Sequence, residues 1–103
     1  MIVRLWNART TAENEPLYRR HLEEAVFPTM RSIDGFIDAH LLERALDGEV
    51  ELLVESRWES MATVRRFAGD TFERAVVTPT AKSLLTSFDD TVSHYEIKAR
   101  ALP

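Results

Sequence analysis

The fold is decided by residues 36–58, which read FIDAHLLERALDGEVELLVESRW. Apolar and polar side chains alternate on both sides of Asp47-Gly48, and a period of two residues is typical of β-strands. Asp-Gly is a strong signal for a two-residue hairpin turn, because its positions accept a positive φ. The segment therefore predicts two antiparallel strands, at residues 36–45 and 49–58.

The same alternation near the two ends of the chain predicts further strands at residues 2–9 and 91–98. A helix over about residues 13–32 is predicted between the first two strands, from apolar residues at helical spacing. Ser60 and Gly69 are good N-terminal and C-terminal residues for a second helix. Between Thr71 and Phe88 the pattern is weaker, and we expect short helical turns near residues 72–76 and 81–85.

The order strand, helix, strand, strand, helix, strand is the split-βαβ arrangement. It predicts an α+β, ferredoxin-like domain with a four-stranded antiparallel sheet and two helices on one face. At 103 residues the chain has room for one domain, which we expect to span residues 1–103. A domain of this size buries roughly two thirds of its unfolded surface, so further burial in an oligomer would add stability.

Two sets of side chains alternate along the predicted strands. The set expected to face the helices is mostly apolar: Val3, Leu5, Ala39, Leu41, Leu52, Val54, Tyr95 and Ile97. The opposite set mixes charged with large apolar residues, which predicts a partly buried contact between two sheets. We therefore expect a homodimer through the face bearing Arg4, Trp6, Glu55, Arg57 and His94. The alternative is a solvated face with a few isolated apolar residues, which are common on protein surfaces.

Composition excludes several classes of function. The net charge is −4 and no basic stripe follows the chain, so we expect no nucleic-acid partner. The absence of cysteine excludes disulfides, thiolate metal sites and a cysteine nucleophile. No apolar run is long enough to span a membrane, and the N-terminus does not resemble a signal peptide, so we expect a cytoplasmic protein. His21 with Glu24, and His94 with Glu96, are isolated pairs that predict no metal site.

Two segments resemble the antibiotic-biosynthesis-monooxygenase branch of the dimeric α/β-barrel superfamily. They are Arg57-Trp58-Glu59-Ser60 and the helix end Phe67-Ala68-Gly69-Asp70. The start Arg4-Leu5-Trp6 and the segment from Phe88 to Glu96 are similar to uncharacterised bacterial members. The resemblance implies two protomers whose sheets pack face to face in a barrel, and a pocket in each protomer between its own sheet and helices. Characterised members include cofactor-free oxygenases of phenolic polyketides, quinol oxygenases and haem-degrading enzymes.

Haem-degrading members carry an Asn on the first strand, a Trp on the second helix and a His shortly after it. Asn7 matches the first of these positions, but Phe67 stands in place of the Trp. The His position falls on Val76 or Val77, and valine cannot ligate iron. The resemblance therefore implies no haem-degrading activity, and we expect no cofactor.

A cofactor-free oxygenase needs an apolar pocket with a few polar groups directed inward. The sequence offers three candidates for catalysis, Asn7, His21 and His94, and four for substrate binding, Tyr18, Trp58, Phe67 and Tyr95. Each has a plainer alternative. Asn7 could bond the backbone at a strand end, His21 could be a helix boundary residue, and His94 could pair with a carboxylate at the dimer face. Trp58 could fill the core at the junction of strand and helix.

The leading hypothesis is a cofactor-independent monooxygenase-like enzyme that acts on a small aromatic, polyketide-like or quinol substrate. A rival is a non-catalytic dimeric module that binds a small hydrophobic ligand. A third hypothesis is another reaction on the same scaffold, such as isomerisation or decarboxylation by a histidine. Because fold does not determine function, the geometry of the pocket must separate them.

Overall fold

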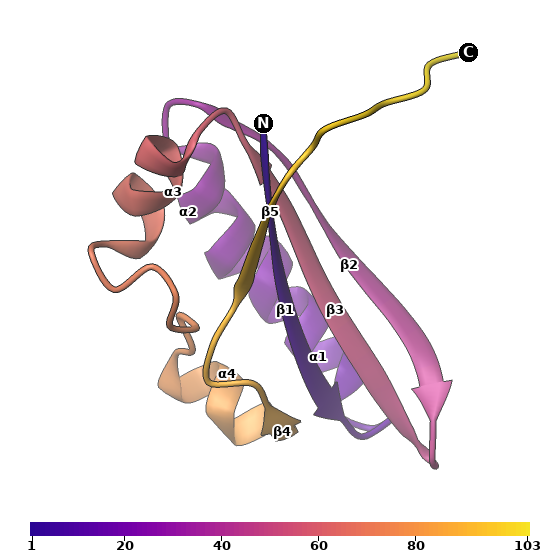
Figure 1. The fold of residues 1–103 in the computed structure, drawn as a ribbon. Helices are drawn as coiled ribbons and strands as arrows, with labels where there is room; N and C mark the ends of the chain where they lie inside the picture. Colours follow the sequence, from indigo (N-terminus) through magenta and orange to yellow (C-terminus); the bar gives the residue numbers. More distant parts are fainter.

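A single antiparallel sheet carries all the helices on one of its faces (Figure 1). The structure, a computed structural model, describes residues 1–103. Its elements are β1 (Ile2–Thr10), α1 (Glu15–His21), η1 (Leu22–Val26), α2 (Phe27–Arg31), β2 (Phe36–Leu46), β3 (Glu49–Trp58), α3 (Met61–Ala68), α4 (Pro79–Leu84), β4 (Leu85–Phe88) and β5 (Ser93–Glu96). The predicted α+β, ferredoxin-like fold is confirmed, although the sheet has five strands where four were expected.

β1 lies at the centre of this sheet. One edge of β1 pairs with β3, and β3 pairs with β2. Its other edge is shared by two short strands: β5 pairs with the first half of β1 and β4 with the second half. The sheet is open, because these strands do not close on β2. The additional strand is β4, which lies in the segment where the sequence pattern was weakest.

The central hairpin follows the prediction. β2 and β3 pair from Phe36 with Trp58 to Leu46 with Glu49. The two turn residues both adopt a positive φ, 52° at Asp47 and 77° at Gly48. These angles are those of the turn whose twist matches that of the flanking strands.

The first predicted helix is one helical stretch interrupted by a π-helical turn, η1. The amide of Phe27 donates to the carbonyl of Leu22, five residues earlier. Pro28, which has no N–H to donate, occupies the first turn of α2, where that loss is tolerated. The proline therefore does not end the helix; the wider turn precedes it.

The second predicted helix is confirmed as α3, and its ends are capped as expected. The Ser60 hydroxyl accepts a hydrogen bond of 3.3 Å from the Thr63 amide, and Gly69 ends the helix with a φ of 80°. The helical turn expected at residues 72–76 is shorter and earlier: one turn closes from the Arg74 amide to the Thr71 carbonyl at 3.0 Å. The backbone after it pairs with the segment before β5, through the Ala75 amide to Asp90 at 2.8 Å and the Val92 amide to Glu73 at 2.9 Å.

The face assignment is right for β2 and β3 and wrong for β1 and β5. Leu52 and Val54 are buried under the helices as predicted. On β1 the even-numbered residues are buried instead, including Arg4, Ala8 and Thr10. In the ladder Arg4 is paired with Ser56 on one side and with His94 on the other, so all three lie on the helix side.

The expected dimer face therefore does not exist as one surface. Glu55 and Arg57 lie on the face of the sheet opposite the helices, which we call the open face. Arg4, Trp6 and His94 lie on the helix side. Ile2, Trp6 and Ala8 are as apolar as Val3 and Leu5, so local alternation along β1 could not identify the buried side.

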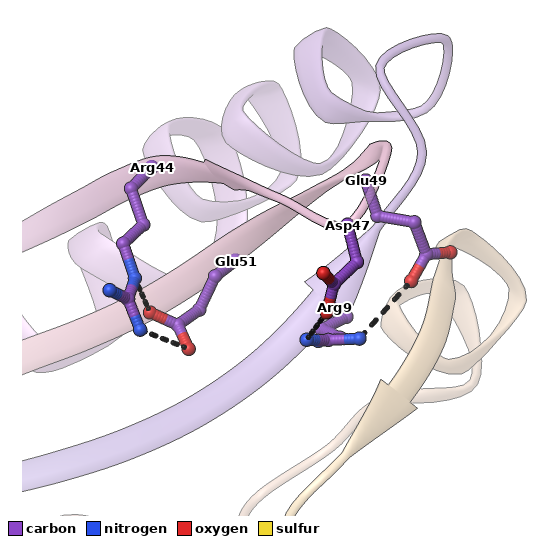
Figure 2. A network of polar contacts seen from close by, with 5 residues as sticks. All are labelled: Arg9, Arg44, Asp47, Glu49 and Glu51. Atoms are coloured by element: carbon purple, nitrogen blue, oxygen red, sulfur yellow. Dashed lines mark hydrogen bonds and ion pairs between the residues drawn. The ribbon is translucent and has the colours of Figure 1, made fainter.

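Charged residues of the open face are paired within the chain. Arg44 on β2 binds Glu51 on β3 at 2.6 Å, and Arg9 on β1 reaches Asp47 at 3.3 Å and Glu49 at 3.9 Å (Figure 2). Asp38 and Arg57 form a further pair. Leu42 remains exposed among these ion pairs.

Candidate functional site

A cavity lies between the helix side of the sheet and the helical layer. Its volume is about 50 Å³, and ten of its 14 lining residues are hydrophobic. The floor is formed by β1 and β3, and the wall by α1 and η1, with contributions from Phe67, Val76 and Val92. Besides Trp6, five side chains in this largely apolar lining carry a polar atom that can form hydrogen bonds: Arg4, Tyr18, His21, Ser56 and Thr78. Such a surface, with a few polar groups, is typical of small-molecule sites.

Tyr18 supplies a neutral hydroxyl to the cavity. Its side chain is 2% exposed, and burial raises the pKa of the phenol well above its usual range. The hydroxyl has no hydrogen-bond partner in the chain, whereas every side-chain nitrogen or oxygen without accessible surface has one. The Tyr18 oxygen therefore keeps some accessible surface, and Tyr18 lines the cavity. It remains protonated at neutral pH and can donate to a ligand.

His21 lies one helical turn from Tyr18, and the two ring centroids are 6.4 Å apart. The His21 Nε2 atom is 3.1 Å from the hydroxyl of Thr78. That hydroxyl also accepts from the Ala81 amide at 3.2 Å and so caps α4. Thr78 thus fixes the imidazole ring against the start of α4. An imidazole placed beside a ligand can exchange a proton with it through a ring nitrogen.

Arg4 is a buried cation with no acidic partner. Its side chain is 5% exposed, and burial lowers its pKa to about 10, which leaves it charged at neutral pH. The guanidinium donates to two carbonyls, from Nη1 to Phe72 at 2.6 Å and from Nη2 to Arg74 at 3.3 Å. None of the ion pairs in the protein includes Arg4.

His94 supports Arg4 from β5. Its Nε2 atom is 3.0 Å from the Arg4 Nη1 atom. Because a guanidinium can only donate, this Nε2 must be the acceptor, and the proton of the neutral ring must be on Nδ1. Burial and the positive charge of Arg4 lower the pKa of His94, and Glu73 opposes them weakly. His94 does not line the cavity itself.

Trp58 lies in the core next to the cavity. It is fully buried, stacks on Phe67 with ring centroids 5.2 Å apart, and meets the edge of Phe36 at 5.1 Å. Its indole N–H donates to the Ser56 hydroxyl at 2.9 Å, so that N–H is not free for a ligand. Trp58 thus contacts the cavity through Phe67 and Ser56, both of which line it.

The other predicted site residues lie elsewhere. Asn7 is paired with Leu53 in the ladder and therefore lies on the open face, where its amide contributes to the lowered pKa of Glu51 after the larger effect of Arg44. Tyr95 is paired with Val3 on the same open face and is exposed. Of the seven predicted residues, the structure brings Tyr18, His21 and Phe67 together around the cavity.

Sequence reasoning missed Arg4, Trp6 and Thr78 as lining residues. A signal for Arg4 was present: it is the single charged residue in the even-numbered set from Ile2 to Ala8. Thr78 directly precedes Pro79, a pattern typical of a helix N-terminus. Neither signal identifies which segments of the chain meet at the cavity.

A haem does not fit this site. The cavity is far smaller than a tetrapyrrole, and Val76, which lines it, offers no atom that could bind iron. No three histidine, aspartate or glutamate side chains converge at any point of the chain. None of the helices is both long and apolar enough to cross a lipid bilayer.

The family model described as antibiotic biosynthesis monooxygenase matches residues 1–76. No protein of curated function matches the sequence. Among solved structures, a candidate antibiotic biosynthesis monooxygenase from Bacillus cereus is 17% identical, with a TM-score of 0.72 over 100% of this chain and 96% of that one. A monooxygenase from Streptomyces coelicolor in complex with nanaomycin D is 15% identical, with a TM-score of 0.68 over 99% and 91%.

A third similar structure is a mutant of MhuD with two manganese protoporphyrin IX molecules in each active site. It is 17% identical, with a TM-score of 0.71 over 100% of both chains. At these identities the three structures support the fold alone, whereas the family model covers about three quarters of the sequence. The chain belongs to the antibiotic biosynthesis monooxygenase family.

Proposed function

We propose that the protein is a cofactor-independent monooxygenase that oxidises a small aromatic or quinol substrate in the cavity between sheet and helices. The observation that carries this proposal is the placement of His21 and Tyr18 side by side on the wall of an otherwise apolar cavity. Family membership supports the same type of reaction.

The chemistry asked of the protein is modest. His21 takes a proton from a hydroxyl or an activated CH₂ group of the substrate, and the electron-rich anion then reacts with O₂. Tyr18 and Arg4 stabilise the negative charge that develops, since donors in a water-poor site act strongly on such charge. For an anthrone-type CH₂ group, one oxygen atom becomes the carbonyl and the other leaves as water with the two hydrogens.

Phe67 and Trp58 form the aromatic side of the proposed site. Phe67 lines the cavity near the Arg4 guanidinium, which lies 5.8 Å from the Phe67 centroid, and the fully buried Trp58 stacks on Phe67. A planar substrate would pack against Phe67, and Trp58 would keep that ring in place. Asn7, His94 and Tyr95 have no direct part in this site; His94 acts through Arg4.

The second candidate is a non-catalytic module that binds a small hydrophobic ligand. The observation in its favour is the contact of His21 with Thr78, which engages Nε2, one of the two nitrogens that a base could use. Isomerisation or decarboxylation at the same histidine is a third candidate, and it would need no oxygen.

We further infer that two copies pair through the open face of the sheet. Leu42 and Leu53 lie opposite each other there, with Val3 and Leu5 on the adjacent strand. Because the ion pairs of this face are formed within one chain, its apolar residues would supply most of the contact. Homodimeric pairing would leave the cavity on the outer, helix-covered side of each sheet.

Oxygen uptake tests the proposed reaction. The purified protein is incubated with anthrones, quinols and naphthols, and uptake is compared with the uncatalysed rate and with Tyr18→Phe. We expect uptake with at least one substrate, and a lower rate in Tyr18→Phe, which retains the ring and loses the donor. A lack of uptake with ligand binding intact would favour the binding module. Substrate turnover under anaerobic conditions would favour isomerisation or decarboxylation.

A further inference from the structure

We infer that the ligand of the cavity is a small aromatic carboxylate, and that the Arg4 guanidinium binds its carboxylate group. The inference rests on the proposed function only in taking the cavity as the ligand site. It does not require catalysis, and it names a chemical class that the proposed reaction leaves open.

The first argument is the unbalanced charge of Arg4. Each of the other buried or half-buried arginines of the sheet has an acidic partner: Arg9 binds Asp47 and Glu49, and Arg57 binds Asp38. Arg4 is more deeply buried than either, yet its partners are two carbonyls and a neutral histidine. A buried charge without a counterion is costly, and an anionic ligand would remove that cost.

The second argument is the set of N–H groups that Arg4 leaves free. A guanidinium has five N–H donors. The two N–H groups on Nη1 donate to the Phe72 carbonyl and to His94 Nε2, and one N–H group on Nη2 donates to the Arg74 carbonyl. The Nε–H and one Nη2–H remain. Every side-chain nitrogen of the protein that has no accessible surface forms a hydrogen bond. The Arg4 Nε atom forms none, so it must have accessible surface.

These two nitrogens form the fork that binds a carboxylate with two parallel hydrogen bonds. The same protein uses this fork elsewhere: Arg44 binds Glu51 through Nε at 2.6 Å and Nη2 at 3.4 Å. Arg57 binds Asp38 through the same two atoms. Arg4 thus has available the donors that its two neighbours in the sheet use for carboxylates.

The third argument is the character of the remaining surface. Most of the lining is hydrophobic, and Phe67 lies under the guanidinium at 5.8 Å. Glu73 is the carboxylate whose charge reaches His94, but it is exposed and forms no ion pair with Arg4. A ligand carboxylate would therefore not meet a competing acid within the cavity.

Benzoate and benzyl alcohol are the probes that test the inference. They have the same ring, and only benzoate carries a charge and a second oxygen. Binding to the wild-type protein is followed by NMR titration, with the Arg4 Nε–H resonance as the local readout. We expect benzoate to shift that resonance and to bind about tenfold or more tightly than benzyl alcohol, as for hydrogen bonds to charged groups.

Two variants assign the preference to Arg4. Arg4→Met removes the charge at similar length, and we expect benzoate to bind it no better than benzyl alcohol. Arg44→Met, which removes an exposed arginine from the open face, should leave the preference unchanged. If Arg4→Met does not fold, Arg4→Lys retains the charge without the fork and should show a reduced preference.

Equal affinity for the two probes, an unchanged preference in Arg4→Met, or no binding of either probe would overturn the inference. These outcomes are separate from the fate of the proposed reaction. Oxygen uptake on neutral quinols without a carboxylate preference would keep the oxygenase and reject the inference. A carboxylate preference without any oxygen uptake would support the inference and argue against the oxygenase.

Discussion

Arg4 and His94 face each other from neighbouring strands, with 3.0 Å between Nη1 and Nε2. The contact joins a permanent cation to a base that must stay neutral in order to accept from it. Together with the carbonyls of Phe72 and Arg74, it keeps a charged side chain in place under the helical layer.

We expect His94 to titrate below the ordinary histidine pKa of about 6.5. Burial is the larger cause and the charge of Arg4 the second. Because the pKa is lower in the folded than in the unfolded protein, the stabilisation is complete above about pH 6.5 and is lost as the pH falls through the folded-state pKa. NMR titration of the imidazole measures the midpoint, with a short unstructured histidine peptide as the reference. A His94 midpoint at or above that of the peptide would contradict the assignment.

Glu43 gives the opposite pH dependence. It lies on the helix side of β2, where desolvation first and the nearby Glu15 carboxylate second raise its pKa to about 7. A raised carboxyl pKa means that the folded protein holds the proton more tightly, so stability should decrease between about pH 4.5 and 7.

In Glu43→Gln that decrease should be smaller, since the amide does not ionise. Thermal unfolding across this pH range checks the prediction, with Glu23→Gln as the control for an exposed acid on the adjacent helical segment. Identical pH profiles in the wild type and Glu43→Gln would show that Glu43 does not carry the effect.

Gly35 is required by both its backbone angle and its surroundings. Its φ is +94°, and an added Cβ would lie 2.6 Å from the Thr63 hydroxyl oxygen on α3. Gly48 has a similar φ of +77° with nothing within 4 Å of such a Cβ. Gly35→Ala should therefore lower the free energy of unfolding by about 1–3 kcal/mol more than Gly48→Ala, as is usual for overpacking. Urea denaturation of both variants measures the difference, and equal losses would argue against the close contact.

The proposed dimer places exposed Leu42 in an interface. Leu42 on the open face and Leu17 on α1 have similar exposed fractions, 45% and 48%. We expect Leu42→Glu to shift the protein towards monomer, because a charge would be buried in the contact, and Leu17→Glu to have no such effect. Sedimentation equilibrium measures the mass. A wild-type protein that is monomeric at micromolar concentration would reject the interface.

The sequence was sufficient for those elements whose signals are local. Asp47-Gly48 determines the hairpin, Ser60 and Gly69 bound α3, and the strong alternation of β3 identifies its buried side. Each of these features depends on residues within a few positions of one another. The element order that follows from them predicts the ferredoxin-like fold.

The site depended on contacts that are distant in the sequence. Arg4 is stabilised under the helices by Phe72, Arg74 and His94, about 70 to 90 residues away, so a charge on a strand suggested solvent instead. The error on β1 carried over to β5, because the two strands are paired. It also moved Asn7 to the wrong side, whereas Tyr18 and His21 were placed by helical spacing, which is local.

The central claim is that chemistry takes place on the helix side of the sheet, and the most direct test compares one residue from each side. Oxygen uptake is measured for His21→Ala, in the cavity, and Asn7→Ala, on the open face, with a substrate that the wild type oxidises. We predict that uptake is lost in His21→Ala and retained in Asn7→Ala, with both variants folded by circular dichroism. Uptake that is retained without His21 and lost without Asn7 would contradict the claim and assign the reaction to the open face.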